Sequence, residues 1–339
     1  MLDEFLGVCG GGRGDFLGKL RGARRGRSRR ALRARAQICV RTARYTFKQV
    51  EGRGGQGRPA LAKSEGPQRR VGRKQAETSM QIRGPYVHIY AMSDIHGCLD
   101  AFRASLSTVD LDAEDSKLVL LGDYCDRGPD SLGVFELIMG LQKRYGDRVV
   151  ALRGNHEEMF LEYIDEVTDP NFTQAWILAD SNLATAKSLL DAEAFKHVKH
   201  LLRLRKFEEA YAFTVERIKA EHADIIAWVR KLPYFYESPF GQVFVHAGVD
   251  EEAGEDWELG TAVESLTMMP PDYVGRKFYL DVIAGHINTE AISGITGYRG
   301  IWHDGASHFY IDGNVMKNGE VAVLSYDSET GKYGGPGLE

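Results

Sequence analysis

The sequence predicts an α/β fold in which parallel strands alternate with helices. Apolar runs of strand length recur from residue 87 onward, and stretches of helical period separate the first three of them. Each run is closely followed by Asp, His or Asn. Because ligands of α/β folds collect at the carboxyl ends of the strands, these polar clusters predict one shared site.

Six strands and four helical stretches can be placed in order along the chain. The predicted strands are residues 87–92 before SDIHG, 118–121 before GDYCDRG, 149–152 before RGNHEE, 243–245 before HAG, 282–284 before GHIN and 309–311 before DGN. The predicted helices are residues 101–109, 131–144, 191–204 and 210–229. The last two lie in a helical insertion, residues 158–235, for which two interpretations stay open: a solvated helical face, or a cap beside the site whose basic residues help to select an anionic substrate.

The first 80 residues differ in composition from the rest of the 339-residue chain. They contain 16 Arg and 4 Lys against 6 acidic residues, a net charge of +14, whereas the whole chain has −5. A segment so rich in Arg and Gly cannot bury enough apolar surface to offset the entropy of ordering. We therefore predict a disordered extension over 1–80 and a folded domain over 81–339.

Three interpretations of this basic extension stay open. Clustered Arg could bind nucleic acid or an acidic partner, and nucleic acid is expected only through this segment. An organellar transit peptide would also be rich in Arg and poor in acid. Alternatively, the start codon is assigned too far upstream, in which case Met80 would be the natural start.

Hydropathy and cysteine usage indicate a cytoplasmic protein without a membrane partner. No apolar run in the sequence approaches the roughly 18–20 residues needed to span a bilayer. The four cysteines (Cys9, Cys39, Cys98 and Cys125) form no CxxC pair and no spacing typical of a disulfide framework or zinc site. We expect them to be reduced thiols.

The residue types that follow the strands predict a hydrolytic metal site. They combine carboxylate, imidazole and carboxamide groups without thiolate, a donor set that suits Mn, Fe or Zn in catalysis. The candidates are Asp94, His96, Asp123, Asp126, Asn155, His156, His246 and His286. So many ligands favour two ions, and a carboxylate such as Asp123 can bridge ions about 3.5–4 Å apart that share a water.

Each cluster taken alone has a simpler structural interpretation. A single DxH after a strand can be turn chemistry, Asn155 can begin a helix as its N-cap, and GDYCDRG can hold a surface ion pair. The occurrence of five clusters at five strand ends favours the shared metal site.

The motifs SDIHG, GDYCDRG, RGNHE, HAG and GH, in that order, resemble those of the calcineurin-like metallophosphoesterases. More narrowly, they resemble the PPP-type phosphatases, especially the compact bacterial and phage members. The resemblance covers roughly residues 85–325 and implies a four-layer αββα sandwich with the metals at the sheet edges. Two departures are notable. Ser93 replaces the usual glycine, and Asn288 stands where the phosphodiesterase branch has a metal-binding histidine, which favours the PPP branch.

The resemblance also implies a function. The protein would be a metal-dependent phosphomonoester hydrolase, most simply a serine/threonine protein phosphatase, whose attacking water is activated by two divalent ions. Mn is the first expectation for these ions, with Fe or Zn as alternatives. The substrate would be a phosphoprotein or a phosphorylated small molecule, and the close alternative is symmetric hydrolysis of dinucleoside tetraphosphates. A non-catalytic nucleic-acid or partner-binding protein is a further alternative.

Roles for individual residues follow from the same resemblance. Asp94 and His96 would bind the first metal, Asp123 would bridge both, and the second metal would be bound by Asn155, His246 and His286. His156 would be the general acid, Asp126 its hydrogen-bond partner, and Arg127 the group that grips the phosphoryl oxygens. These three catalytic residues argue against the non-catalytic alternative. The second arginine of many PPP enzymes stays unassigned, with Arg276 and Arg299 as its candidates.

Overall fold

A computed structural model describes residues 87–165, 183–268 and 273–338. The expectations for the basic extension, residues 1–80, lie outside these ranges. All of the described residues belong to one compact unit, Thr78–Glu339.

The first sheet has the strand order β10-β9-β1-β2-β3. Its strands are β1 (His88–Met92), β2 (Ser116–Leu120), β3 (Val149–Ala151), β9 (Leu324–Asp327) and β10 (Lys332–Gly334). The first three run parallel, and their register places Met92 opposite Leu120 and Leu120 opposite Ala151. The carboxyl ends of these three strands therefore lie side by side at one edge. β9 and β10 extend the sheet in antiparallel fashion.

The second sheet has the strand order β4-β5-β6-β8-β7. Its strands are β4 (Phe235–Ser238), β5 (Gln242–Val245), β6 (Asp281–Ala284), β7 (Trp302–His303) and β8 (His308–Tyr310). β5, β6 and β8 are parallel, with Val245, Ala284 and Tyr310 in register, while β4 and β7 are antiparallel edges. All six predicted strands are thus confirmed. The sequence analysis did not predict the four antiparallel strands β4, β7, β9 and β10.

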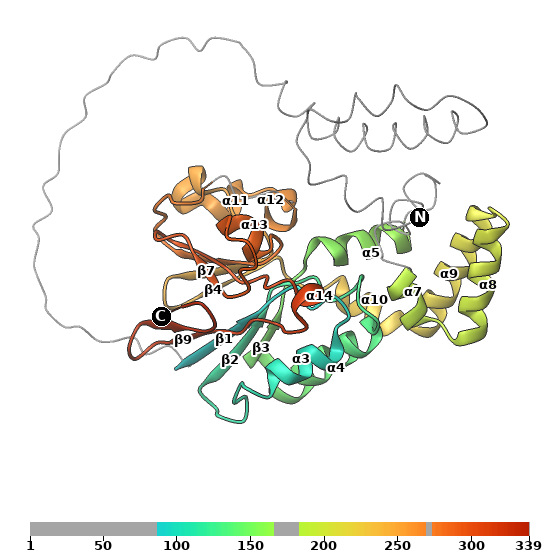
Figure 1. The fold of residues 1–339 in the computed structure, drawn as a ribbon, viewed down its shortest axis with the longest axis horizontal. Helices are drawn as coiled ribbons and strands as arrows, with labels where there is room; N and C mark the ends of the chain where they lie inside the picture. Colours follow the sequence, from blue (N-terminus) through green and yellow to red (C-terminus); the bar gives the residue numbers. More distant parts are fainter. Residues whose placement is uncertain (1–86, 166–182, 269–272, 339) are drawn as a thin grey trace, which may run out of the picture. The chain divides into compact units, whose positions relative to one another are not determined.

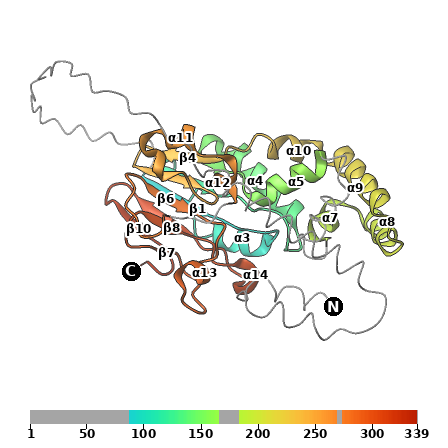
Figure 2. The same cartoon turned by 90° about the horizontal axis from the view of Figure 1, so that it is seen from above.

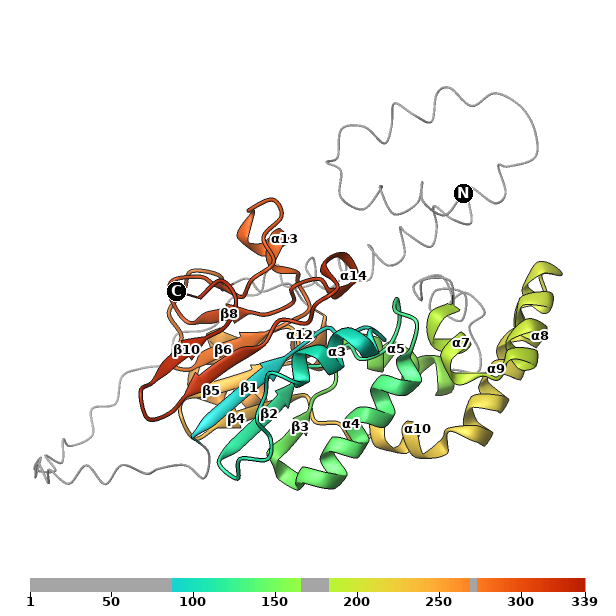
Figure 3. The ribbon, with the colours of Figure 1, turned by 60° about the horizontal axis from the view of Figure 1, so that its bottom comes forward.

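Helices cover the outer face of each sheet. Those associated with the first sheet are α3 (Leu99–Leu106), α4 (Ser131–Tyr145), the 3-10 helix η1 (Gly146–Arg148), α5 (Asn155–Asp165), α7 (Ala184–Leu189), α8 (Ala192–Arg203), α9 (Phe207–Glu221) and α10 (Ala223–Val229). The second half of the chain adds the 3-10 helix η3 (Glu251–Asp256), α11 (Trp257–Gly260), α12 (Val263–Thr267), α13 (Thr289–Ser293) and α14 (Val315–Asn318). Figures 1 and 3 show α3 and α4 along β1, β2 and β3.

The buried apolar residues form three layers that confirm the predicted αββα sandwich. One cluster joins the two sheets, with Ile89 and Val119 of the first sheet packed against residues such as Phe244 and Ile283 of the second. A second cluster lies between the first sheet and its helices. A third places Trp257 and other helical side chains against the outer face of the second sheet.

The helical insertion corrects one prediction. Residues 191–204 form α8 as expected, but the continuous helix predicted over 210–229 is wrong, because the chain breaks at His222 into α9 and α10. His222 has φ −131° and ψ 38°, and its ring Nε2 donates a hydrogen bond to the Leu189 carbonyl at 2.7 Å. This tertiary contact stabilises the break without Pro or Gly. Figures 1 and 2 show the α8–α9 hairpin at the end of the domain opposite the second sheet.

Across the three described ranges, no helix is both long and apolar enough to cross a membrane.

His308 links the second sheet to η3. The residue is buried at the start of β8, with Nδ1 2.5 Å from the Asp304 carboxylate and Nε2 2.5 Å from the Glu251 carboxylate. Since carboxylates accept hydrogen bonds, a fully bonded ring carries a proton on both nitrogens. Burial lowers the pKa of His308, but Glu251 and Asp304 outweigh this effect and raise it above 6.5.

This cluster should make stability depend on pH. Its contribution to the free energy of unfolding should be complete below pH 6.5 and be lost as pH rises through the raised pKa of His308, because deprotonation removes one of the two donors. His308→Gln keeps a donor but cannot titrate, so the variant should lose this decline and be less stable at pH 6 by about 3 kcal/mol. Urea unfolding followed by circular dichroism between pH 6 and 9 measures both effects.

His303→Gln is the matched control, because His303 lies on neighbouring β7, stacks on Phe309 and has no such carboxylate partner within the described ranges. It should retain the wild-type pH dependence. Equal pH dependence in wild type and His308→Gln would show that His308 is not the titrating group.

Candidate metal centre

The motif loops meet where the parallel strands of both sheets end. Backbone hydrogen bonds join the loops to one another. The Asp94 N–H donates to the Gly122 carbonyl at 3.1 Å, the His96 N–H to the Asp123 carbonyl at 2.8 Å, and the Gly285 N–H to the His246 carbonyl at 2.9 Å. These bonds join the loop after β1 to the loop after β2, and the loop after β5 to the loop after β6. The two pairs are linked by the His286 N–H, which donates to Asp94 Oδ2 at 3.0 Å.

Six of the predicted site residues have a left-handed backbone. They are Asp94 (φ 55°), His96 (φ 46°), Asp123 (φ 58°), Asp126 (φ 67°), Arg127 (φ 70°) and His286 (φ 63°). Residues with a Cβ adopt this conformation at a cost of roughly 1–2 kcal/mol each. The concentration of these residues at the strand ends shows that the loops are held in a demanding shape by surrounding contacts.

Two motif glycines permit the close approach of these loops. A Cβ at Gly154 would overlap the Asp123 carboxylate, and a Cβ at Gly128 would overlap the His96 carbonyl. Glycine is therefore required at both positions by space.

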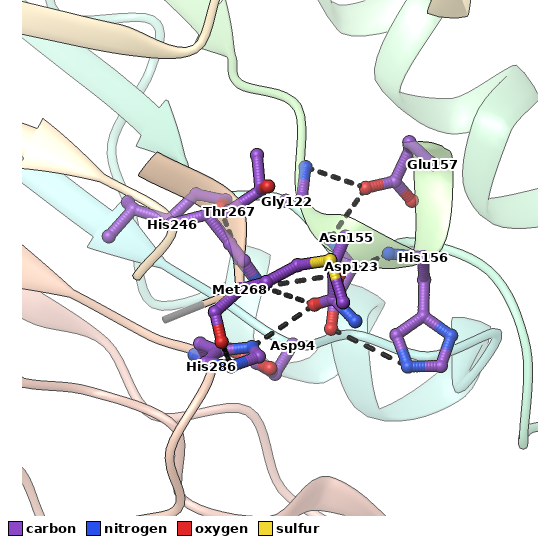
Figure 4. Close-up of polar contacts among 12 residues, drawn as sticks. Asp94, Gly122, Asp123, Asn155, His156, Glu157, His246, Thr267, Met268 and His286 are labelled. Atoms are coloured by element: carbon purple, nitrogen blue, oxygen red, sulfur yellow. Dashed lines mark hydrogen bonds and ion pairs between the residues drawn. The ribbon is translucent and has the colours of Figure 1, made fainter. Parts of the chain in front are cut away.

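Asp123 lies at the centre of the site (Figure 4). The residue is 2% exposed, and its Oδ1 accepts a hydrogen bond from the His156 backbone N–H at 3.0 Å. Oδ1 also lies 3.3 Å from His246 Nε2, while Oδ2 lies 3.7 Å from His96 Nε2 and 3.8 Å from His156 Nε2. The two carboxylate oxygens thus face different sets of histidines, which is the arrangement expected of a bridging ligand.

Backbone carbonyls determine which nitrogen of each predicted histidine ligand faces the site. His96 Nδ1 donates to the Cys125 carbonyl at 3.0 Å, and His246 Nδ1 donates to the Leu121 carbonyl at 2.8 Å. His286 has the opposite orientation, with Nε2 donating to the Met268 carbonyl at 3.1 Å. Because a carbonyl only accepts, the nitrogen facing it carries the proton. In the neutral tautomer the other nitrogen then offers a lone pair to the site, as metal ligation requires.

Asn155 adds a carboxamide oxygen to these groups. Its Oδ1 lies 2.9 Å from His246 Nε2, 3.1 Å from His286 Nδ1 and 3.3 Å from both carboxylate oxygens of Asp123. A half-turn of the amide would bring its NH₂ group to the same atoms. The orientation with oxygen inward gathers acceptors around one point. Carboxylate, carboxamide and imidazole atoms together fit a divalent cation.

The described residues contain two sets of potential ligand atoms, and within each set these atoms lie within 4.8 Å of one another. One contains His96, Asp123 and His156, and the other contains Asp123, His246 and His286. Asp123 belongs to both. Asp94 is adjacent, with Oδ1 3.9 Å from His96 Nε2 and Oδ2 accepting from the His286 backbone N–H at 3.0 Å. The structure therefore brings all six predicted metal ligands together and also places the predicted acid, His156, within the first set.

Burial and neighbouring charges shift the pKa values of these groups in opposite directions. Burial raises the pKa of Asp94 and lowers the pKa of His96 to about 3. Burial would also raise the pKa of Asp123, but His246 and His156 outweigh it and hold that pKa well below 3.8. Conversely, Asp123 overcomes the effect of burial on His246 and raises its pKa to about 9. A carboxylate that stays ionised when buried is suited to bind a cation.

The three predicted catalytic residues form a connected group beside this centre. His156 Nδ1 donates to Asp126 Oδ2 at 2.7 Å, and Asp126 is completely buried. Arg127 Nη1 lies 2.8 Å from His96 Nε2, and its Nη2 lies 3.1 Å from His156 Nε2. A guanidinium has only donors, so His96 Nε2 accepts from it, as would His156 Nε2 in the neutral ring that is left once the acid has given up its proton.

Glu157 is a structural member of the site that the sequence analysis did not single out. It is completely buried, and its carboxylate accepts from the backbone N–H groups of Asp123 (2.8 Å), Tyr124 (2.7 Å) and Gly154 (3.0 Å). Burial and Asp123 raise the pKa of Glu157 to about 7. Its position as the last residue of GNHE, at the start of α5, was the available signal.

Other candidates have different surroundings. Asn288 is the N-cap of α13, where its side chain accepts from the Ala291 N–H at 3.0 Å. Arg276 is exposed and lies over the Tyr273 ring, and Arg299 is also exposed. Neither arginine is assigned to the site.

Comparisons with known proteins point to one family. The model of the calcineurin-like phosphoesterases matches residues 87–288. A symmetrical bis(5'-nucleosyl)-tetraphosphatase of Nitrosococcus oceani is 28% identical over 175 residues, which cover 51% of this chain and 47% of that protein. Serine/threonine-protein phosphatase 1 of Salmonella typhimurium is 40% identical over 75 residues, covering 22% and 32%.

These matches span about half of the first relative's length and about a third of the second's. A solved protein serine/threonine phosphatase of Saccharomyces cerevisiae superimposes with a TM-score of 0.46 at 12% identity, covering 73% of this chain and 74% of that one. At this level the superposition adds nothing to the family match.

Asp123→Asn should impair metal binding more than any other single amide substitution in the site. The variant keeps the shape of the side chain but removes the charge shared by both ligand sets. We expect two bound Mn ions per chain in the wild type, and loss of at least one with weaker binding of the other in the variant. Isothermal titration calorimetry measures both stoichiometry and affinity.

Glu157→Gln separates support of the loop from ligation. An NH₂ group in place of one oxygen would face a backbone N–H, so the unfolding free energy should fall by about 1–3 kcal/mol while two ions still bind. Glu193→Gln, at an exposed position on α8, is the control and should change neither the unfolding free energy nor the metal stoichiometry.

For Asp123→Asn, an unchanged metal stoichiometry would contradict the bridging role.

Proposed function

The chain belongs to the calcineurin-like phosphoesterase family, and from this premise we propose that it hydrolyses phosphate monoesters as a serine/threonine protein phosphatase. The observation that carries the proposal is the position of the His156–Asp126 pair and Arg127 beside the two ligand sets that share Asp123. An acid, a phosphate-binding cation and a metal centre are the groups that phosphomonoester hydrolysis requires.

We propose that two divalent ions occupy the centre, Mn first, with Fe or Zn as alternatives. The residues that would hold them are Asp94, His96, Asp123, Asn155, His246 and His286. When bound, the ions would polarise the phosphoryl group and activate the attacking water. The backbone carbonyls that fix the three histidine tautomers keep the ligand atoms directed at the centre.

His156 is the proposed general acid. Burial lowers its pKa, but Asp123 and Asp126 outweigh burial and raise it above 6.5. A proton is then available near neutral pH for the alkoxide that leaves phosphorus. Asp126 accepts from Nδ1, which orients the ring so that Nε2 faces the site.

Arg127 is the proposed phosphate-binding residue. One terminal nitrogen points to His96, a predicted metal ligand, and the other points to His156, the proposed acid. A phosphoryl group between the metals and His156 would therefore lie within reach of the planar guanidinium fork. Such a fork can donate two parallel hydrogen bonds to phosphoryl oxygens.

Symmetric hydrolysis of dinucleoside tetraphosphates is the second candidate. It is favoured by the length of the match to the Nitrosococcus relative of that name, 175 residues, against 75 for the Salmonella protein phosphatase. The substrate in this case is a phosphorylated small molecule instead of a phosphoprotein. For either activity we propose a cytoplasmic location, and nucleic-acid binding only through residues 1–80, outside the described ranges.

Substituting each of the three predicted catalytic residues should change the kinetics in a different way. With Mn present, His156→Asn should lower kcat on a phosphomonoester by roughly 10²–10³-fold with little change in metal affinity, because only the proton donor is lost. Asp126→Asn should also lower mainly kcat. Arg127→Ala should both raise KM and lower kcat. Steady-state kinetics with calorimetric metal titrations measure these effects.

Arg103→Ala, at an exposed position on α3, is the control for removal of a positive charge. It should behave as wild type. Equal kcat for wild type and His156→Asn would refute the acid role.

A substrate panel tests the assignment itself. Phosphoserine and phosphothreonine peptides, a dinucleoside tetraphosphate and bis(p-nitrophenyl) phosphate should each be assayed with Mn, Fe and Zn. We expect the highest kcat/KM on the phosphopeptides. A higher value on the dinucleotide would transfer the assignment to the second candidate, and dominant diesterase activity would contradict both.

A further inference from the structure

The helical insertion contributes a buried side chain to the catalytic group. Thr185 lies in the first turn of α7, the short helix that precedes the α8–α9 hairpin, and is completely buried. Its hydroxyl donates a hydrogen bond to Asp126 Oδ1 at 2.7 Å and accepts one from the Asp126 backbone N–H at 2.8 Å. One hydroxyl therefore contacts both the side chain and the backbone of the same aspartate.

The direction of these hydrogen bonds can be deduced from the groups involved. The Asp126 carboxylate accepts at Oδ1 from Thr185 and at Oδ2 from His156 Nδ1. The single hydroxyl proton of Thr185 is used for Oδ1, so in its 3.0 Å contact with Ser131 Oγ the serine is the donor. Ser131 therefore donates to Thr185, and Thr185 donates to Asp126 Oδ1. His156 donates to the other carboxylate oxygen of Asp126.

Thr185 is also placed to support the unusual backbone of Asp126. With φ 67°, this residue has a left-handed conformation in which its buried N–H needs a partner other than a regular helix or strand. Thr185 supplies that partner from a position 59 residues along the chain. Asp126 is thus held at two atoms by the same hydroxyl.

We propose that Thr185 is a positioning residue through which the insertion fixes the Asp126 carboxylate so that Oδ2 is aimed at His156. The inference rests on the proposed role of His156 as general acid. It identifies a functional contribution from the insertion, outside all of the motifs that follow the strands.

A second residue of α7 offers a matched comparison. Ser188, one turn after Thr185, accepts from the Leu132 N–H at 2.8 Å and lies 3.3 Å from Asp130 Oδ1. These contacts attach α7 to the start of α4 but do not involve Asp126. Ser188→Ala therefore tests the docking of the helix, whereas Thr185→Val tests the contact with Asp126.

The experiment compares two phosphate monoesters with the Mn-loaded full chain. The phenolate of phenyl phosphate is a poor leaving group that needs a proton. The 2,4-dinitrophenolate of 2,4-dinitrophenyl phosphate leaves readily without one. Thr185→Val should lower kcat on phenyl phosphate roughly 10- to 100-fold with unchanged KM, and leave kcat on the dinitrophenyl ester close to wild type. Thr185→Ser should restore the activity on phenyl phosphate, and Ser188→Ala should match wild type on both esters.

Several results would overturn the inference. These are equal losses on both esters in Thr185→Val, no restoration by serine, or the same selective loss in Ser188→Ala. Thermal melting and Mn titration verify that each variant is folded and loaded. If valine prevents folding, Thr185→Cys, a weaker donor, should show a smaller loss confined to phenyl phosphate, and a loss on both esters would again refute the role.

His156→Asn separates this inference from the proposed function. A selective loss on phenyl phosphate in His156→Asn but not in Thr185→Val would refute only the role of Thr185. The absence of leaving-group selectivity in His156→Asn would refute the acid role, and the role of Thr185 with it.

Discussion

The burial of a negative charge at Asp123 is the constraint on which the rest of the site depends. An ionised carboxylate that is 2% exposed must be offset by donors or positive charge, since an unpaired buried charge costs several kcal/mol. The His156 N–H and three imidazole nitrogens approach its two oxygens from opposite sides. Asp94 and Glu157, which accepts from the N–H of Asp123, add further buried carboxyl groups nearby. This concentration of buried carboxyl groups fits a pair of divalent cations.

That constraint explains the strained backbone around the centre. Side chains from both sheets can converge on one carboxylate only if each loop turns sharply as its strand ends, which accounts for the left-handed residues and for glycine at 154. The conformational cost is offset by hydrogen bonds between loops and by the packed sheets beneath them. The αββα sandwich thus serves as a rigid support for six strand ends, and its stability supports the geometry of the site.

The sequence predicted the parts of the fold that carry local signals. Strands with continuous apolar runs followed by polar residues were recognisable, whereas the antiparallel strands β9 (LSYD) and β10 (KYG) have no continuous apolar run. The break at His222 depends on a contact with Leu189, and the role of Thr185 depends on a contact 59 residues away. Neither can be read from local periodicity. The candidate ligands were identifiable because each follows a strand directly, so that topology alone brings them together.

The two halves of the site depend on different parts of the chain. The ligand atoms are oriented by carbonyls of Leu121, Cys125 and Met268, which lie in or near the motif loops. The Asp126 carboxylate is instead held by α7 of the insertion, a segment with no strand-end motif. With the proposed roles, metal binding and proton transfer would therefore depend on different supporting contacts. Changes in the insertion would then alter turnover through Asp126 while the contacts that orient the histidine ligands stay intact.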